Sequence, residues 1–159
     1  MARSKPILGL IEEVKLYLPN KKFIRLKAKV DTGAHFTALD ISLAKKLNLL
    51  PSLRAFHKHC PKFKITIKNF KDIKRKIKSD YLKTLKTKCP GLVDVKLIPA
   101  TNGFSVRPFF KIELSLKGKR IKTMASLVDR SHMGYIVLLG KSDMAGFLID
   151  PTKNIYNNL

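Results

Sequence analysis

The stretch that decides the fold is AKVDTGA, at positions 28–34. Just before its turn, the apolar residues Leu26, Ala28 and Val30 alternate with basic residues, which is the period-two pattern of a strand that buries one face. This predicted strand runs directly into Asp31 and the Thr-Gly-Ala that follows it. The stretch therefore predicts a strand that ends in a turn carrying a carboxylate.

Each residue of that turn has a use in catalysis. Asp31 offers a carboxylate, Thr32 a hydroxyl group, Gly33 a close backbone approach, and Ala34 a side chain small enough for a confined space. The alternative is an ordinary surface turn, since Asp followed closely by Gly is common in turns of no functional importance. Sequence blocks further along the chain favour the catalytic interpretation.

Most of the remaining pattern indicates strands. Val93, Val95 and Leu97 alternate with other residues, the region 110–116 alternates again, and Asn102-Gly103 between them supplies turn chemistry, so we expect a long hairpin. Further strands are predicted over 121–128 and 135–139, with one helical turn over 141–145 and an extended segment over 147–149. The fold class expected is mainly β, a small closed or partly open barrel.

Helical structure is expected in two places. Leucines spaced by four and three predict a helix over 41–49, which Pro51 would stop. Alternation around 63–67 predicts a further strand, and the strongly basic stretch 68–88 fits either a solvated helix or a mobile insertion. We interpret residues 1–159 as a single domain with a basic insertion at about 55–90.

The charge of the chain is strongly positive. Its 33 Lys and Arg against 11 Asp and Glu give a formal net charge of +22, which favours acidic partners such as nucleic acid, anionic membrane or acidic polypeptide. The apolar patch at 7–11 is too short for a signal-peptide core, and no apolar run approaches the roughly 20 residues of a membrane span. We therefore expect a cytoplasmic protein without a membrane partner, and one whose two cysteines remain thiols.

The chain resembles the retropepsin-like aspartic proteases, in which a flap hairpin and an apolar-apolar-Gly segment accompany the catalytic turn. Here these correspond to the region 98–106 and to LLG at 138–140. It resembles more closely the bacterial family called ATP-dependent zinc proteases, which is associated with ATP-grasp ligases that add glutamate to a ribosomal protein. Five blocks carry that resemblance: AKVDTGA at 28–34, NG at 102–103 with RP at 107–108, LVDRSHM at 127–133, LLGK at 138–141 and DP at 150–151.

The resemblance implies an aspartic mechanism, in which two carboxylates share a proton across a water molecule. Because the chain has one such turn, the second Asp31 would come from another copy, in a two-fold homodimer. Catalysis would involve Asp31, Thr32 and Gly33, and substrate binding would involve a second group of residues. That group is Ala34, Asn102, Gly103 and Arg107.

The resemblance also places Asp129, Arg130, Ser131 and Gly140 at characteristic family positions without giving them roles. A buried ion pair between Asp129 and Arg130 is as plausible as a contact of either residue with substrate. The substrate implied is an acidic or glutamate-rich polypeptide, and a glutamate ligase is an implied partner. No nucleotide-binding loop is visible in the sequence, so any use of ATP would belong to such a partner.

Two other functions stay open. One is a non-catalytic module that binds an acidic protein or nucleic acid through the barrel or its basic face, since a fold does not by itself confer activity. The other is a zinc-dependent protease, with ligands drawn from His57, His59, Cys60 and Cys89. The histidines lack the spacing of known zinc motifs, so we expect no cofactor and favour a solvated basic face over nucleic-acid binding.

Overall fold

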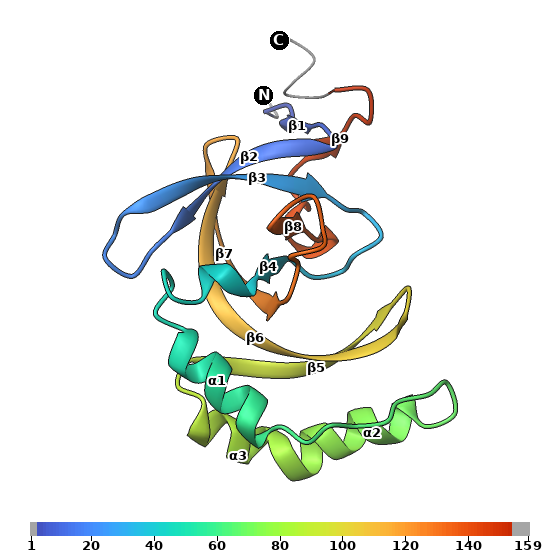
Figure 1. The fold of residues 1–159 in the computed structure, drawn as a ribbon. Helices are drawn as coiled ribbons and strands as arrows, with labels where there is room; N and C mark the ends of the chain where they lie inside the picture. The colour runs from blue at the N-terminus through green and yellow to red at the C-terminus, as the bar shows by residue number, and fades with distance from the viewer. Residues whose placement is uncertain (1–2, 154–159) are drawn as a thin grey trace.

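The computed structural model describes residues 3–153, which form a barrel with a layer of helices on one side (Figure 1). The strands are β1 Ile7–Leu8, β2 Ile11–Tyr17, β3 Phe23–Val30, β4 Ala38–Asp40, β5 Leu92–Ala100, β6 Gly103–Leu116, β7 Lys119–Val128, β8 Val137–Leu139 and β9 Leu148–Ile149. The helices are α1 Leu50–His59, α2 Phe70–Lys76 and α3 Leu82–Lys88, with a π-helical turn at Ile77–Tyr81 between the last two. Short 3₁₀ turns occupy Ile41–Leu43 and Lys141–Asp143.

The barrel is closed by the pairing of β2 with β6. The strand order is β2-β3-β8-β4-β7-β6-β5, so the additional β2–β6 contact makes a ring of all these strands except β5. Strand β5 pairs only with β6, and the two form the long hairpin that the sequence predicts. The prediction of a mainly β fold with a closed barrel is therefore confirmed.

Strand β8 lies at the centre of the arrangement that holds the Asp31 turn. It pairs in parallel with the end of β3, with Val30 opposite Leu139, and it pairs antiparallel with β4. Strand β4 in turn pairs in parallel with β7. Strands from the early part of the chain, β3 and β4, thus meet strands from its later part, β7 and β8, next to the turn.

The interior of the barrel continues into the space beneath the helices. Fully buried Phe110 and Leu114 of β6 belong to the same apolar cluster as Ile77 and Leu85 of the helical segment and Phe56 of α1. Burial of such side chains stabilises the fold by about 1.5–3 kcal/mol each. The helices are thus held on the barrel by their apolar faces.

The predicted helix over 41–49 is wrong in its position. Only Ile41–Leu43 is helical there, and the main helix α1 begins at Leu50 and includes Pro51. A proline in the first turn of a helix loses no intrahelical hydrogen bond, because the first N–H groups have no partner within the helix. Pro51 therefore begins this helix instead of ending one.

The predicted strand around residues 63–67 is also wrong. Residues 61–66 are irregular, and the half-buried Phe63 and Ile65 pack against the core while the residues between them face solvent. That arrangement produces strand-like alternation without a neighbouring strand. The side chain of Asn69 instead binds the backbone N–H of Thr66 at 2.7 Å.

The basic stretch 68–88 is helical and supports the hairpin. The ring of Phe70, at the start of α2, stacks on the ring of Phe104 in β6, with centroids 5.4 Å apart and planes at 10°. Helix α3 packs on α1 and on β5. Of the two alternatives for this stretch, the solvated basic helix is the one observed.

No helix within residues 3–153 has the length and apolar composition needed to cross a bilayer.

Candidate active site

The turn that carries Asp31 is held by hydrogen bonds at both of its ends. The Asp31 N–H donates to the carbonyl oxygen of Leu139 at 3.0 Å, and the Gly33 N–H donates to Oδ1 of Asp31 at 2.9 Å. Beyond the turn, the Lys141 N–H donates to the carbonyl oxygen of Ala34 at 2.8 Å. The Asp31 carboxylate therefore has a defined position, set by its own turn and by the segment that follows β8.

Gly140 lies under this turn, where no other residue fits. A Cβ atom at position 140 would lie 2.3 Å from the carbonyl carbon of Phe36 and 2.7 Å from the carbonyl oxygen of His35. These neighbours are backbone atoms, which cannot move aside as a flexible side chain could. Gly140, a family-pattern residue of unknown role, thus allows the β8 segment to touch the backbone of the Asp31 loop.

Two buried polar side chains, neither of them singled out by the sequence, fix this contact from below. The Thr37 hydroxyl donates to the Asp143 carboxylate and accepts a hydrogen bond from the Gly140 N–H at 3.1 Å. Both side chains are buried, so water does not compete for these bonds. Thr37 and Asp143 are far apart in the sequence, so no local sequence pattern could predict that they pair.

The turn opens into a pocket of about 740 Å³ that lies between it and the β5–β6 hairpin. Asp31, Gly33 and Ala34 line one wall, and residues 97–101 of the hairpin line another. Arg107 and Arg130 also line it, and Asp31 is the one carboxylate in the lining. The pocket therefore combines one acidic group with two guanidinium groups, under a hairpin that covers it.

The two arginines are largely withdrawn from solvent. Burial lowers the pKa of Arg130 from its usual value, whereas the carboxylates of Asp40 and Asp31 partly offset that effect. Burial also lowers the pKa of Arg107, and the nearby charge of Arg130 lowers it further. Two poorly hydrated positive charges close together favour an anion between them, such as the carboxylate of an acidic substrate.

Arg130 is held in place by hydrogen bonds to the Asp40 carboxylate and to the backbone of Tyr135. The Arg130 N–H donates to Oδ2 of Asp40 at 2.6 Å, and Nε donates to the carbonyl oxygen of Tyr135 at 3.1 Å. Burial raises the pKa of Asp40, but hydrogen bonds from Ser42 and from the Arg130 N–H outweigh it, and the pKa lies below its usual value. Asp40 is not among the residues predicted from the sequence, although an Asp two residues before Ser at the start of a helical turn is a typical N-cap.

The predicted buried ion pair between Asp129 and Arg130 is wrong. Asp129 is exposed, and its carboxylate accepts a hydrogen bond from the Ser131 N–H at 2.9 Å. Such a bond across two residues closes a local turn, which gives Asp129 and Ser131 a structural reason to follow β7. Of this block, Arg130 alone reaches the pocket.

The remaining predicted residues lie around the opening. Asn102 and Gly103 form the exposed tip of the hairpin, where Gly103 has a φ of 116° that other residues rarely adopt, and neither lines the pocket. Thr32 is exposed, and its hydroxyl has no hydrogen-bond partner within residues 3–153. The structure therefore brings together Asp31, Gly33, Ala34, Arg107 and Arg130, and leaves Thr32 and the hairpin tip facing outward.

The residues considered as zinc ligands do not fit a zinc site. Within residues 3–153, no three His, Cys, Asp or Glu side chains lie close enough to hold a metal ion. His59 faces the ammonium group of Lys88, with 3.4 Å between Nδ1 and Nζ. Burial, with a smaller effect of Cys89, raises the pKa of the Cys60 thiol to about 11.

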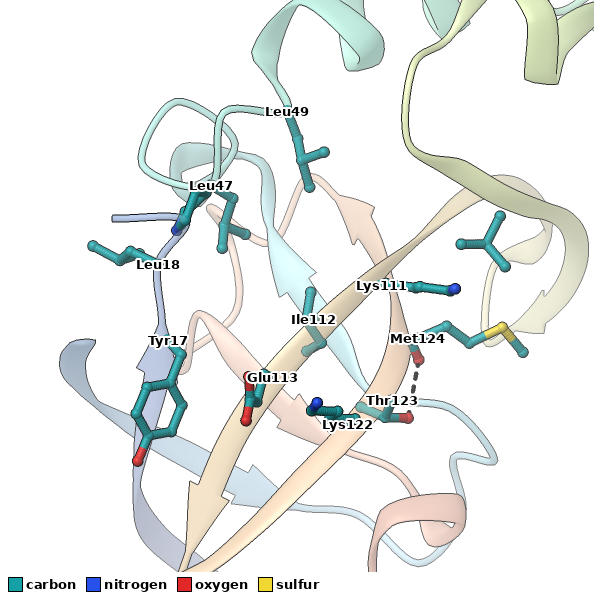
Figure 2. A pocket seen from close by; sticks show the side chains of 12 residues that line it. Tyr17, Leu18, Leu47, Leu49, Lys111, Ile112, Glu113, Lys122, Thr123 and Met124 are labelled. Carbon is teal, nitrogen blue, oxygen red and sulfur yellow. Dashed lines mark hydrogen bonds between the residues drawn. The ribbon is translucent and has the colours of Figure 1, made fainter. Parts of the chain in front are cut away.

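A second hollow, of about 650 Å³, lies away from Asp31 on the barrel (Figure 2). It lies between the residues after β2 and the strands β6 and β7, and it shares no lining residue with the Asp31 pocket. Its single carboxylate, Glu113, accepts a hydrogen bond from Nε of Arg120 at 2.6 Å. Because the one carboxylate that lines this hollow is already paired with Arg120, the Asp31 pocket is the candidate active site.

No family model and no curated protein matches the sequence of this chain. Among solved structures, the chain is similar to a protein of unknown function (DUF785) from Legionella pneumophila subsp. pneumophila str. Philadelphia 1, with 16% identity, a TM-score of 0.49, and coverage of 96% of this chain and 98% of that one. It is also similar to the protease of Simian Foamy Virus (mac), with 13% identity, a TM-score of 0.43, and coverage of 84% and 90%. At these values the likeness is limited to the overall path of the backbone.

Proposed function

We propose that this chain is an aspartic-type endopeptidase that works in the cytoplasm as a two-fold homodimer. One Asp31 carboxylate would accept a proton from a water molecule while the water oxygen attacks the scissile carbonyl carbon. The Asp31 of the second copy would donate a proton to the carbonyl oxygen, which gives a tetrahedral diol. As the C–N bond breaks, the first Asp31 would give the proton that it took from water to the amine nitrogen, and a hydroxyl group of the diol would return a proton to the second Asp31.

The observation that carries this proposal is the place of Asp31. Its carboxylate is fixed by the Gly33 N–H, and it lines a pocket that the β5–β6 hairpin covers. Substrate held below the hairpin would lie between the backbone of the hairpin and the carboxylate. The proposal accounts for a carboxylate that lines a pocket of this size instead of standing on the open surface.

The arrangement around Thr32 supports a dimer. Its hydroxyl group is exposed and is not bonded within the described part of the chain, although it follows a residue whose position is fixed on both sides. A second copy related by a two-fold axis would bring its own turn against this one, so that each Thr32 could bond across the axis. That contact would also bring the second carboxylate that the mechanism needs.

The two arginines favour an acidic polypeptide as substrate. Arg107 and Arg130 line the pocket beside Asp31, where their guanidinium groups could form charge-assisted hydrogen bonds with a carboxylate of the substrate. A glutamate-rich chain would supply carboxylates at successive positions, and the net charge of +22 would raise its concentration near the surface. The resemblance to the ATP-dependent zinc protease family adds a glutamate ligase as a candidate partner, which would make the substrate.

A specific observation favours a second function, a non-catalytic module that binds an acidic protein. A single chain supplies one carboxylate and two arginines to the pocket, which suits the binding of an anion better than the activation of water. Binding of acidic peptide by a protein that never cleaves it, in either oligomeric state, would establish this alternative.

The test is cleavage of a glutamate-rich peptide library by the parent protein and by Asp31→Asn, with the oligomeric state recorded from acidic to neutral pH. We expect cleavage by the parent dimer and none by the Asp31→Asn dimer. Asp80→Asn is the matched control, because Asp80 is exposed on the helical segment and hydrogen-bonds only its neighbour Ser79. Equal cleavage by the parent and Asp31→Asn proteins would rule out the aspartic mechanism.

A further inference from the structure

A small hollow of about 170 Å³ lies between the helical segment and the barrel, and its lining is strongly basic. Lys74 comes from α2, Lys78 from the π-helical turn, and Lys96 from β5. Apolar side chains make up the rest of the lining, and no carboxylate is among them. Three lysines from three different elements thus line one small space.

The positive charge of this hollow is only partly neutralised. Nζ of Lys96 forms a salt bridge with Oδ2 of Asp94 at 2.8 Å, whereas neither Lys74 nor Lys78 forms a salt bridge in the described part of the chain. Three positive charges against one negative charge leave a net charge of about +2. A cluster of like charges that is neutralised incompletely attracts an anion.

The hollow adjoins the candidate active site. Phe36, Leu97 and Ile98 line both this hollow and the Asp31 pocket. The ammonium group of Lys96 lies 5.0 Å from the centre of the Phe36 ring, which belongs to the wall that the two spaces share. A polypeptide that occupies the Asp31 pocket and leaves along β5 would pass the three lysines.

We propose that Lys74, Lys78 and Lys96 form an anion-binding subsite that takes an acidic side chain of the polypeptide held in the Asp31 pocket. The apolar lining suits the methylene groups of such a side chain, and the ammonium groups suit its carboxylate. This inference rests on the proposed function for its polypeptide substrate. It gives part of the basic insertion the role of recognising substrate at a distance from the cleaved bond.

The experiment measures binding without cleavage, in an Asp31→Asn background, by fluorescence anisotropy of labelled glutamate-rich peptides at constant salt concentration. Each Glu of the peptide is replaced in turn by Gln, and the protein carries either its natural lysines or Lys74→Gln with Lys78→Gln. We expect one Glu position at which the replacement weakens binding about 3- to 10-fold, and at which the double lysine variant abolishes that difference.

The matched control is Lys83→Gln with Lys86→Gln, which removes the same charge from exposed positions of α3 that do not line the hollow. This control should retain the Glu preference. Equal loss of the preference in both double variants, or no coupled Glu position in any peptide, would overturn the inference and leave only a diffuse basic surface.

Inorganic phosphate is the second probe, since free phosphate could also satisfy three lysines. We expect phosphate to compete with the peptide only weakly, at millimolar concentration or above. Tight binding of phosphate without any Glu preference would overturn the subsite for a peptide. Because the background cannot cleave, failure of the parent protein to cleave any peptide would remove the proposed function and leave this binding test valid.

Discussion

The Asp31 turn and the helical segment from α1 to α3 are stabilised in different ways. Around the turn, backbone atoms touch each other directly, as Gly140 touches the backbone at Phe36, and buried polar groups have assigned partners. The helical segment is attached by apolar side chains such as Ile77 and Leu85, and its lysines are exposed to solvent. Substitutions should therefore damage stability in the first region and change mainly binding in the second.

The largest effect is expected from Gly140→Ala. The added methyl group would meet backbone carbonyl atoms, so either β8 or the Asp31 loop must move, and we expect a loss of at least about 3 kcal/mol in the free energy of unfolding. Urea denaturation measures this loss in the free energy of unfolding. Gly134→Ala is the control, because a Cβ at position 134 meets nothing within 4 Å. A cost below about 1 kcal/mol at position 140 would refute the direct backbone contact.

A smaller loss is expected from Thr37→Val, which keeps the shape of the side chain and removes its hydroxyl group. Asp143 would lose a donor and the Gly140 N–H its acceptor, both in a buried place, so we expect about 1–3 kcal/mol of destabilisation. Thr84→Val, at an exposed position of α3, should be nearly neutral. Equal results for the two variants in thermal unfolding would contradict the role of Thr37.

The turn region should also respond to acid through Asp40. The pKa of Asp40 is lower in the folded state than its usual value of about 3.9, so its contribution is present above that pH and is lost as pH falls through the folded pKa. We expect Asp40→Asn to be less stable at neutral pH by about 1 kcal/mol and to lose less stability below about pH 4. Urea titrations at several pH values check this, and an unchanged acid profile would count against it.

The smallest effect is expected on the helical surface. Arg75 pairs with Asp72 one turn away on α2, and both side chains are exposed, so Arg75→Gln should change stability by less than about 0.5 kcal/mol. Urea denaturation at low and at high salt concentration would measure this change in stability and show how far salt screens the ion pair. A loss as large as that of Thr37→Val would remove the distinction between the two regions.

These differences explain which parts of the structure were predictable. The strand before Asp31 and the β5–β6 hairpin follow from alternation and from glycine and asparagine at the turn, because those signals depend on neighbouring residues. The basic segment could be recognised as a possible helix from its charge. The position of α1 could not, because leucine spacing and a proline fit both a helix that ends and a helix that begins there.

The sequence alone predicts Asp31 as the central residue of the candidate site, but it does not predict which side chains surround Asp31. Asp31 is found from a tetrapeptide and Arg107 and Arg130 from family blocks, but only the fold shows that the two arginines share its pocket. Thr37 and Asp143 meet across 106 positions of sequence, so their pairing depends on how β4 and β8 pack. The Asp129–Arg130 ion pair, one of two alternatives for this block, does not form, because the Asp129 carboxylate is exposed and accepts a hydrogen bond from the Ser131 N–H.

The most direct test of the central claim, catalysis by two Asp31 residues in one dimer, uses mixed subunits. Parent and Asp31→Asn chains are unfolded together in varied proportions, refolded, and assayed on a glutamate-rich peptide that the parent cleaves. If both carboxylates are needed, activity follows the square of the parent fraction, so an equal mixture retains about one quarter of the activity. Activity proportional to the parent fraction, about one half in the equal mixture, would show that each chain acts alone and contradict the account.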